Sequence, residues 1–307
     1  MKSPKSSFLN FHFSFLISHL SIFIFQFSFF ISHFLFSPLP LQAAALPQSS
    51  DYYTLADSAQ YYIGHEQWKE AARCIREALR QQPANVGNAM LFANLGLATG
   101  MDGKYGEAMQ CFDIALSRAP KSVPVLTSKA KIQILASDED GALSTLDNII
   151  ELDSLTPWPR RTRGLMRLRR HQYKEAYDDF RFITDKFPTD SWGPGGMAKC
   201  MELQGLPSQA AGYYRDAIAR CLPEDPDLIE FQLGLIENLG HADQLREALD
   251  VAADAIALHP HEGRLYLLRG WIRQKLLIYR EAEADKKLAL DYGVDPQIVE
   301  QFLPSRR

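Results

Sequence analysis

Apolar and small residues recur at helical spacing between residues 92 and 120. Four of them share one face of a predicted helix because they lie at relative positions 0, 3, 4 and 7: Phe92, Leu95, Gly96 and Thr99. A second stripe with small-large-small order follows at Ala108, Phe112 and Ala115. Asp102 and Gly103 supply a turn between the stripes, and Pro120 prevents the second helix from continuing. The pattern predicts two antiparallel helices, with Gly96 allowing a close approach.

The small residue that opens the second stripe recurs along most of the chain. These alanines are Ala71, Ala108, Ala142, Ala176, Ala210, Ala248 and Ala282, separated by 37, 34, 34, 34, 38 and 34 residues. The positions four and seven residues after each alanine are apolar, with Lys286 as the one exception. Such a period is typical of repeat proteins, in which each unit buries its apolar faces only against its neighbours.

The segment around residue 100 resembles one tetratricopeptide repeat. The resemblance rests on Leu-Gly at 95–96, Ala108, Phe112 and the closing Pro120, with Thr99 in place of the usual Tyr. It implies an all-α fold, a right-handed α-solenoid of about seven helix-turn-helix units. The expected array covers residues 50–303, with units near 52–85, 89–122, 123–156, 157–190, 191–224, 227–262 and 263–296 and then a short capping helix.

Two units of this expected array are less regular than the others. The fifth opens on Trp-Gly-Pro-Gly-Gly at 192–196. Each glycine weakens a helix by roughly 1 kcal/mol relative to Ala, so we expect a bend there. In the sixth unit the core stripe is either Leu233 and Gly234 or the set Leu235, Ile236 and Leu239, and the sequence leaves this register open.

Residues 1–47 differ in composition from the rest of the chain. Residues 8–36 are rich in Phe, Leu and Ile, follow Lys2 and Lys5, and precede an alanine-rich stretch that ends near Ala45. This order is typical of a secretory signal, and we expect export to a bacterial periplasm or cell envelope. The apolar stretch is longer than a usual signal core, so an uncleaved membrane anchor through 8–36 and a misplaced coding start are alternatives.

The remaining composition indicates no catalytic chemistry. A formal net charge of −4 gives no basic face for nucleic acid. The sequence contains no HExxH, GxSxG or Walker-type motif, and His259 and His261 are not spaced to share one helical face. The four cysteines follow no CxxC pattern, although export would permit a disulfide between Cys200 and Cys221. We therefore predict neither an enzyme nor a metal or cofactor site.

The resemblance also implies a binding surface. In tetratricopeptide proteins a second stripe on each first helix lines a concave groove that holds peptides or partner helices. Carried over to this sequence, the candidate partner-binding residues are Tyr53, Gln60, Lys131, Trp158, Arg161, Trp192 and Lys199. Three cations in a groove flanked by two tryptophans suit an acidic segment with apolar anchors. The alternative for the tryptophans is packing between helices.

The first helix of the fourth unit carries a run of arginines, namely Arg160, Arg161, Arg163, Arg167, Arg169 and Arg170. Such a run is either a solvated face or part of the partner-binding surface. Two functions remain open for the whole chain: a scaffold that binds a protein or peptide, and a glycan-binding or enzyme-associated subunit of an envelope assembly. The second would use Trp158, Trp192 and Trp271 as stacking platforms.

Overall fold

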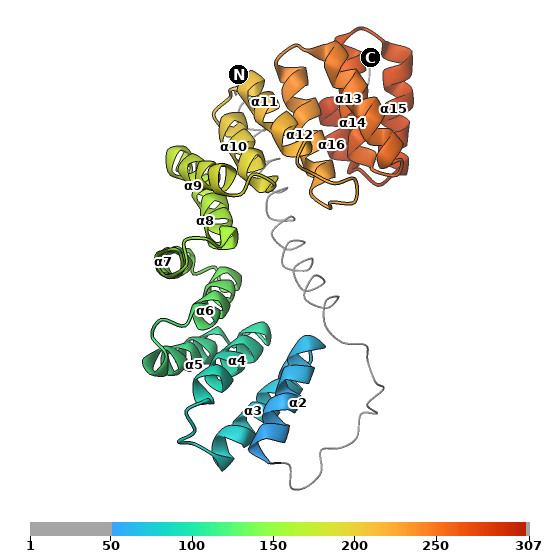
Figure 1. Ribbon diagram of the computed structural model, residues 1–307. Helices are drawn as coiled ribbons and strands as arrows, with labels where there is room; N and C mark the ends of the chain where they lie inside the picture. Colours follow the sequence, from blue (N-terminus) through green and yellow to red (C-terminus); the bar gives the residue numbers. More distant parts are fainter. Residues whose placement is uncertain (1–50, 305–307) are drawn as a thin grey trace, which may run out of the picture. The chain divides into compact units, whose positions relative to one another are not determined.

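The computed structural model describes residues 51–304, and these form a run of α-helices with no strand. In chain order the helices form seven pairs followed by one short helix, and they can be followed by their labels in Figure 1. The pairs are α2 (Tyr52–Gly64) with α3 (Trp68–Gln81), α4 (Asn88–Met101) with α5 (Tyr105–Arg118), α6 (Val123–Leu135) with α7 (Glu139–Leu152), α8 (Pro157–Arg169) with α9 (Tyr173–Lys186), α10 (Trp192–Leu203) with α11 (Pro207–Ile218), α12 (Leu228–His241) with α13 (Leu245–Leu258), and α14 (Gly263–Lys275) with α15 (Tyr279–Asp291). The last helix is α16 (Pro296–Phe302). The predicted all-α fold of helix pairs is confirmed.

The described residues form two compact units that meet in sequence between Arg118 and Ala119. Unit 1 contains α2 to α5, and unit 2 contains α6 to α16. The predicted signal or anchor in residues 1–47 lies outside the described residues. Between residues 51 and 304, none of the helices has the length and apolar character needed to cross a bilayer.

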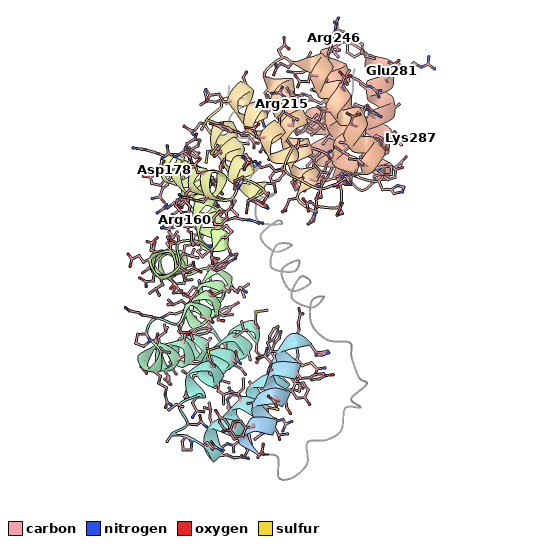
Figure 2. The ribbon with its side chains drawn as sticks, viewed as in Figure 1. Arg160, Asp178, Arg215, Arg246, Glu281 and Lys287 are labelled. Atoms are coloured by element: carbon pink, nitrogen blue, oxygen red, sulfur yellow. The ribbon has the colours of Figure 1, made fainter. Side chains whose placement is uncertain are left out.

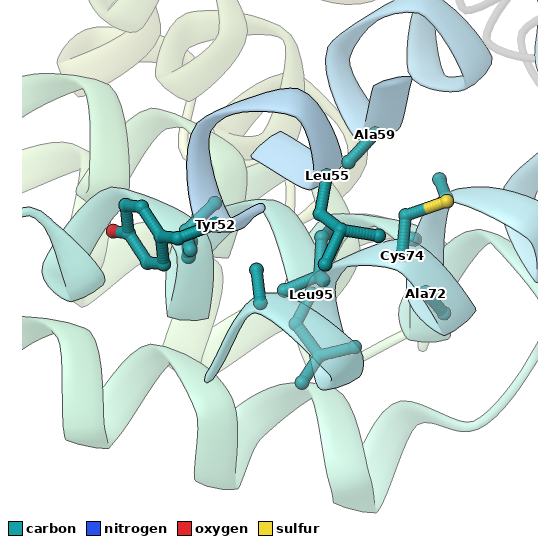
Figure 3. Close-up of a cluster of buried hydrophobic side chains, with 11 residues drawn as sticks. Tyr52, Leu55, Ala59, Ala72, Cys74 and Leu95 are labelled. Carbon is teal, nitrogen blue, oxygen red and sulfur yellow. The ribbon is translucent and has the colours of Figure 1, made fainter. Parts of the chain in front are cut away.

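Unit 1 is held together by small and aliphatic side chains from three helices. Figure 3 shows Leu55 and Ala59 of α2 packed with Cys74 of α3 and Leu95 of α4, all buried. Tyr52 closes one end of this cluster, where its hydroxyl donates to Asn88 Oδ1 at 3.0 Å. The apolar stripes predicted from the sequence therefore form the core.

The turn inside each of the seven helix pairs contains one residue in the same backbone conformation. One residue in each turn has a positive φ: Glu66, Gly103, Ser137, His171, Gly205, Asp243 and Leu277. The spacing of these residues repeats that of the alanines, so every pair closes with one left-handed residue. Only two of the seven are glycines, although L-residues resist this conformation by roughly 1 to 2 kcal/mol.

Glycines of the fourth, fifth and sixth helix pairs provide room for aromatic rings. The ring that each glycine faces determines the register of the sixth repeat. A Cβ added to Gly164 or to Gly196 would lie within 3 Å of the fully buried Phe180 ring. Gly234 has the same relation to Tyr214, since its Cβ would lie 2.5 Å from that ring. Gly234 therefore faces the preceding pair, as Gly196 does, and it does not take the place of Gly164, which faces its own pair. The core stripe of the sixth repeat is Leu235, Ile236 and Leu239, all buried. The glycine-rich start of the fifth helix pair is helical because packing offsets the low helix propensity of glycine.

Lys286, the one polar residue in the apolar pattern, anchors the last helix. Its Nζ lies 2.7 Å from the carbonyl oxygen of Leu303, which caps α16, and 2.7 Å from Glu300 Oε2. A buried ammonium needs such partners to offset its desolvation. The predicted short capping helix is thus present, and the lysine fixes it against α15.

Candidate partner-binding surface

The predicted partner-binding residues lie on the first helices of successive pairs. In unit 1, Tyr53 is in the first turn of α2, where 65% of its surface is exposed. Gln60 lies two turns later, also exposed, and its Oε1 accepts a hydrogen bond from Asn94 Nδ2 of α4 at 3.5 Å. These two predicted residues are accessible to a partner.

The first predicted residues of unit 2 are only half-buried. Lys131 on α6 is half-buried, and burial lowers the pKa of its ammonium. Trp158 lies at the start of α8, and its indole ring forms no aromatic or cation–π contact with any residue in 51–304. Part of the Trp158 surface thus remains open to solvent.

Arg161 and Trp192 come together between neighbouring helices. The Arg161 guanidinium lies 3.7 Å from the centre of the Trp192 ring, a cation–π contact between α8 and α10. Trp192 Nε1 donates to Asp227 Oδ2 at 2.5 Å, and the ring meets Phe231 edge-on at 5.6 Å. Burial lowers the pKa of Arg161 to about 10 and raises that of Asp227. Both predicted residues therefore take part in packing between helices.

Lys199 belongs to a buried polar network between α10, α11 and α12. Its Nζ lies 2.9 Å from Glu202 Oε1, while Glu202 Oε2 accepts from the Tyr214 hydroxyl at 2.6 Å and from Asn238 Nδ2 at 3.1 Å. Burial alone would lower the pKa of Lys199, but the Glu202 carboxylate raises it overall. A partner that used this cation would have to compete with an internal carboxylate.

The arginine run of α8 contacts carboxylates on both neighbouring second helices. Asp179 of α9, with a side chain 3% exposed, accepts from Arg163 Nε at 3.0 Å and from Arg167 Nη1 at 2.7 Å, and Arg160 lies 3.8 Å away. Arg163 also donates to Asp147 of α7 at 2.5 Å. Figure 2 marks Arg160 among the side chains of α8.

The end of the same run pairs with α7. Arg170 donates to Asp140 at 2.7 Å and to Glu139 at 3.0 Å, and Arg169 lies 3.7 Å from Glu139. Five arginines therefore form an ion-pair network that joins α8 to α7 and α9. The run is therefore not a simple solvated face, and its part in the partner-binding surface, through Arg161, stays a prediction.

The same clamp occurs again in the last pair, and its spacing could have been read from the sequence. Asp285 of α15, 1% exposed, accepts from Arg269 at 2.6 Å and from Arg273 at 2.6 Å. In both pairs an arginine is followed four residues later by a second arginine and twelve residues after that by the aspartate. The alanine spacing does not reveal this clamp, whereas the Arg-Arg-Asp spacing does.

Within residues 51–304, the other candidate chemistry is not assembled into a site. No group of three His, Cys, Asp or Glu residues between 51 and 304 is arranged to hold a metal ion. Cys200 and Cys221 are both free thiols, so the structure does not contain the disulfide that export would permit. Burial raises the pKa of the Cys200 thiol to about 12.

Comparison with solved structures identifies the fold. The chain matches a tetratricopeptide repeat protein from Parabacteroides merdae over 82% of its length and 97% of the other chain, with a TM-score of 0.59 and 21% identity. The C-terminal part of a repeat protein from Cytophaga hutchinsonii matches over 80% of this chain and 98% of that one, at a TM-score of 0.63 and 11% identity. The chain has the tetratricopeptide repeat fold.

A third match is YrrB, described as a tetratricopeptide repeat protein with an unusual peptide-binding site. It covers 62% of this chain and 96% of that one, with a TM-score of 0.50 and 18% identity. Neither the protein-family models nor the curated proteins give a match. At these identities the likeness establishes the tetratricopeptide fold alone.

Proposed function

We propose that this protein is a non-catalytic scaffold that binds a peptide or partner segment along the first helices of its repeats. The observation that carries the proposal is the accessibility of predicted stripe residues on a stack of helix pairs, with Tyr53 65% exposed. Within each unit, stacked helix pairs present a surface suited to a partner chain. The same fold carries a peptide-binding site in YrrB, which is consistent with the proposal.

Crosslinking from single sites in the full chain tests the scaffold function. A photo-reactive amino acid replaces Tyr53 or Trp158, and a control replaces Lys69, whose side chain is 79% exposed on the second helix of the first pair. We expect one discrete crosslinked protein from the first two positions and none from the control, followed by saturable binding of that protein in purified form. Equal yields from all three positions would contradict the proposed surface.

The packing of two tryptophans makes a glycan platform the weaker alternative. Arg161 covers a face of Trp192, and Trp271 lies between His241 at 5.0 Å, Lys275 at 4.9 Å and Phe302 at 6.1 Å. Stacking on a sugar requires an accessible ring face. A glycan array probed with the full chain should therefore show no saturable binding.

We further propose that the protein is exported and that its mature chain begins near Leu46. The support is the sequence of residues 1–47 and its alanine-rich end. N-terminal sequencing of the protein purified from its native cell decides between cleavage and anchoring. A chain that retains residues 8–36 in the membrane fraction would favour the anchor.

A further inference from the structure

The stripe of unit 1 differs from that of unit 2 in charge. None of its eight positions is charged: Tyr53, Ala56, Gln60, Ile63, Met90, Ala93, Leu97 and Gly100. The whole of α4 contains no charged residue, and α2 contains only Asp57, at the edge of the stripe. In unit 2 the corresponding positions include Arg161 and the Lys199–Glu202 ion pair.

Two large apolar side chains at equivalent places of α2 and α4 are exposed. Tyr53 is 65% exposed and Met90 is 45% exposed, and each is the second residue of its repeat. Tyr supplies a rigid ring for contact, and Met adapts its shape to an incoming apolar group. Together they offer anchoring points for apolar side chains of a ligand.

An amide pair connects the same two helices. The hydrogen bond from Asn94 Nδ2 to Gln60 Oε1 is long, at 3.5 Å, and it is the only one that either side chain makes within residues 51–304. Each amide keeps further donor and acceptor groups, so the pair presents N–H and C=O groups to an incoming chain. A main-chain amide has the matching donor and acceptor.

We infer that unit 1 binds an uncharged, apolar segment of a partner protein in extended conformation. Alternate side chains of the segment contact Tyr53 and Met90, and its main chain exchanges hydrogen bonds with Gln60 and Asn94. A charged side chain is excluded because the stripe has no counter-ion to offset its desolvation. This inference rests on the proposed scaffold function and names the class of segment and the unit that takes it.

Three end-blocked synthetic peptides test the inference by fluorescence anisotropy with the full chain. All repeat two Leu followed by two copies of a second residue, so that each face of the extended peptide carries both kinds of side chain. The second residue is Ser in the Leu-Ser peptide, Glu in the Leu-Glu peptide and Lys in the Leu-Lys peptide. We expect the Leu-Ser peptide to bind at least about tenfold more tightly than either charged peptide, because charge burial costs more than 1.4 kcal/mol. Its affinity should not change with salt, since no ion pair is formed.

Variants locate the binding site within unit 1. Met90→Ala and Asn94→Ala should each weaken the Leu-Ser peptide by about fivefold or more, whereas the control Lys69→Ala on α3 should leave its affinity unchanged. Met90→Lys should shift the preference toward the Leu-Glu peptide, a gain that a merely misfolded variant would not show. Circular dichroism of each variant confirms that the helices are retained.

Three results would overturn the inference, and none of them by itself refutes the scaffold function. If a charged peptide binds more tightly and Trp158→Ala rather than Met90→Ala weakens it, the scaffold function stands and the choice of unit 1 and of an uncharged segment is wrong. If the Leu-Lys peptide is preferred and Asp57→Asn abolishes that preference, the exclusion of charge is wrong. Failure of the Leu-Ser peptide to bind also refutes the inference, while the crosslinking experiment tests the scaffold function separately.

Discussion

Replacing Asp179 with Asn should destabilise the fourth helix pair, because three arginines lie within 4 Å of this one buried carboxylate. The Asp179 side chain is 3% exposed, and the side chains of Arg163, Arg167 and Arg160 are 12%, 23% and 16% exposed. Asn keeps the shape but removes the charge. Removal of one partner from a buried ion pair costs about 3 to 5 kcal/mol, and partial solvation of the arginines reduces the expected loss to about 2 to 4 kcal/mol.

A matched control is available in the same arginine network. Asp140 pairs with Arg170 at 2.7 Å, but the Asp140 side chain is 90% exposed, so water screens this pair and Asp140→Asn should have little effect. Hydrogen exchange of the α8 and α9 amides is the suitable assay, because repeat units open locally as well as globally. Equal loss of protection in the two variants would refute the assignment of Asp179 as the centre of the network.

Three further perturbations test the core, the turns and the thiols. Phe112→Ala should cost roughly 3 to 5 kcal/mol in urea unfolding, because the ring is fully buried, whereas Ile114→Ala on the same helix, 40% exposed, should cost much less. Leu277→Gly should stabilise the protein by about 0.5 to 1 kcal/mol, since Leu277 has φ 62° and is 68% exposed, and Gly103→Ala should destabilise it by a similar amount, which thermal unfolding of both variants checks. Cys200 should resist alkylation at pH 8 until the protein unfolds, because its raised pKa keeps it protonated, as mass spectrometry of the labelled peptides would show.

The helix pairs could be predicted from the sequence because their cause is local and repeated. The alanine spacing, the stripe of Phe112 and its neighbours, and the turn at Gly103 each act within about one repeat. The role of Lys286 could not be predicted, because it depends on where α16 places the Leu303 carbonyl. The residue type of Leu277 does not indicate a left-handed turn. Only its position in the repeat, equivalent to that of Gly103, indicates it.

The carboxylates that lie beside the cations of the predicted partner-binding stripe could be predicted from sequence spacing only in part. Helical spacing placed Arg161 and Lys199 on the first helices. Glu202, three residues beyond Lys199 on α10, could have been paired with that cation from spacing, whereas Asp227, which precedes α12 and lies near Arg161, could not. Since each cation has an internal carboxylate nearby, the hypothesis of an acidic partner has less support than the sequence suggested.

The sign of the salt effect separates the two hypotheses for the partner. An acidic segment held by Arg161 and Lys199 should lose affinity as salt rises, whereas an uncharged segment on unit 1 should not. Reversal of Arg161 to Glu would be a poor test of either, because the new carboxylate would lie against Trp192 and near Asp227. We expect this variant to lose hydrogen-exchange protection in α8 and α10 without any ligand, and Arg170→Glu, at a half-exposed pair, to lose less. Unchanged protection in Arg161→Glu would show that the contact with Trp192 contributes nothing to the stack, and the cation would again be available for an acidic partner.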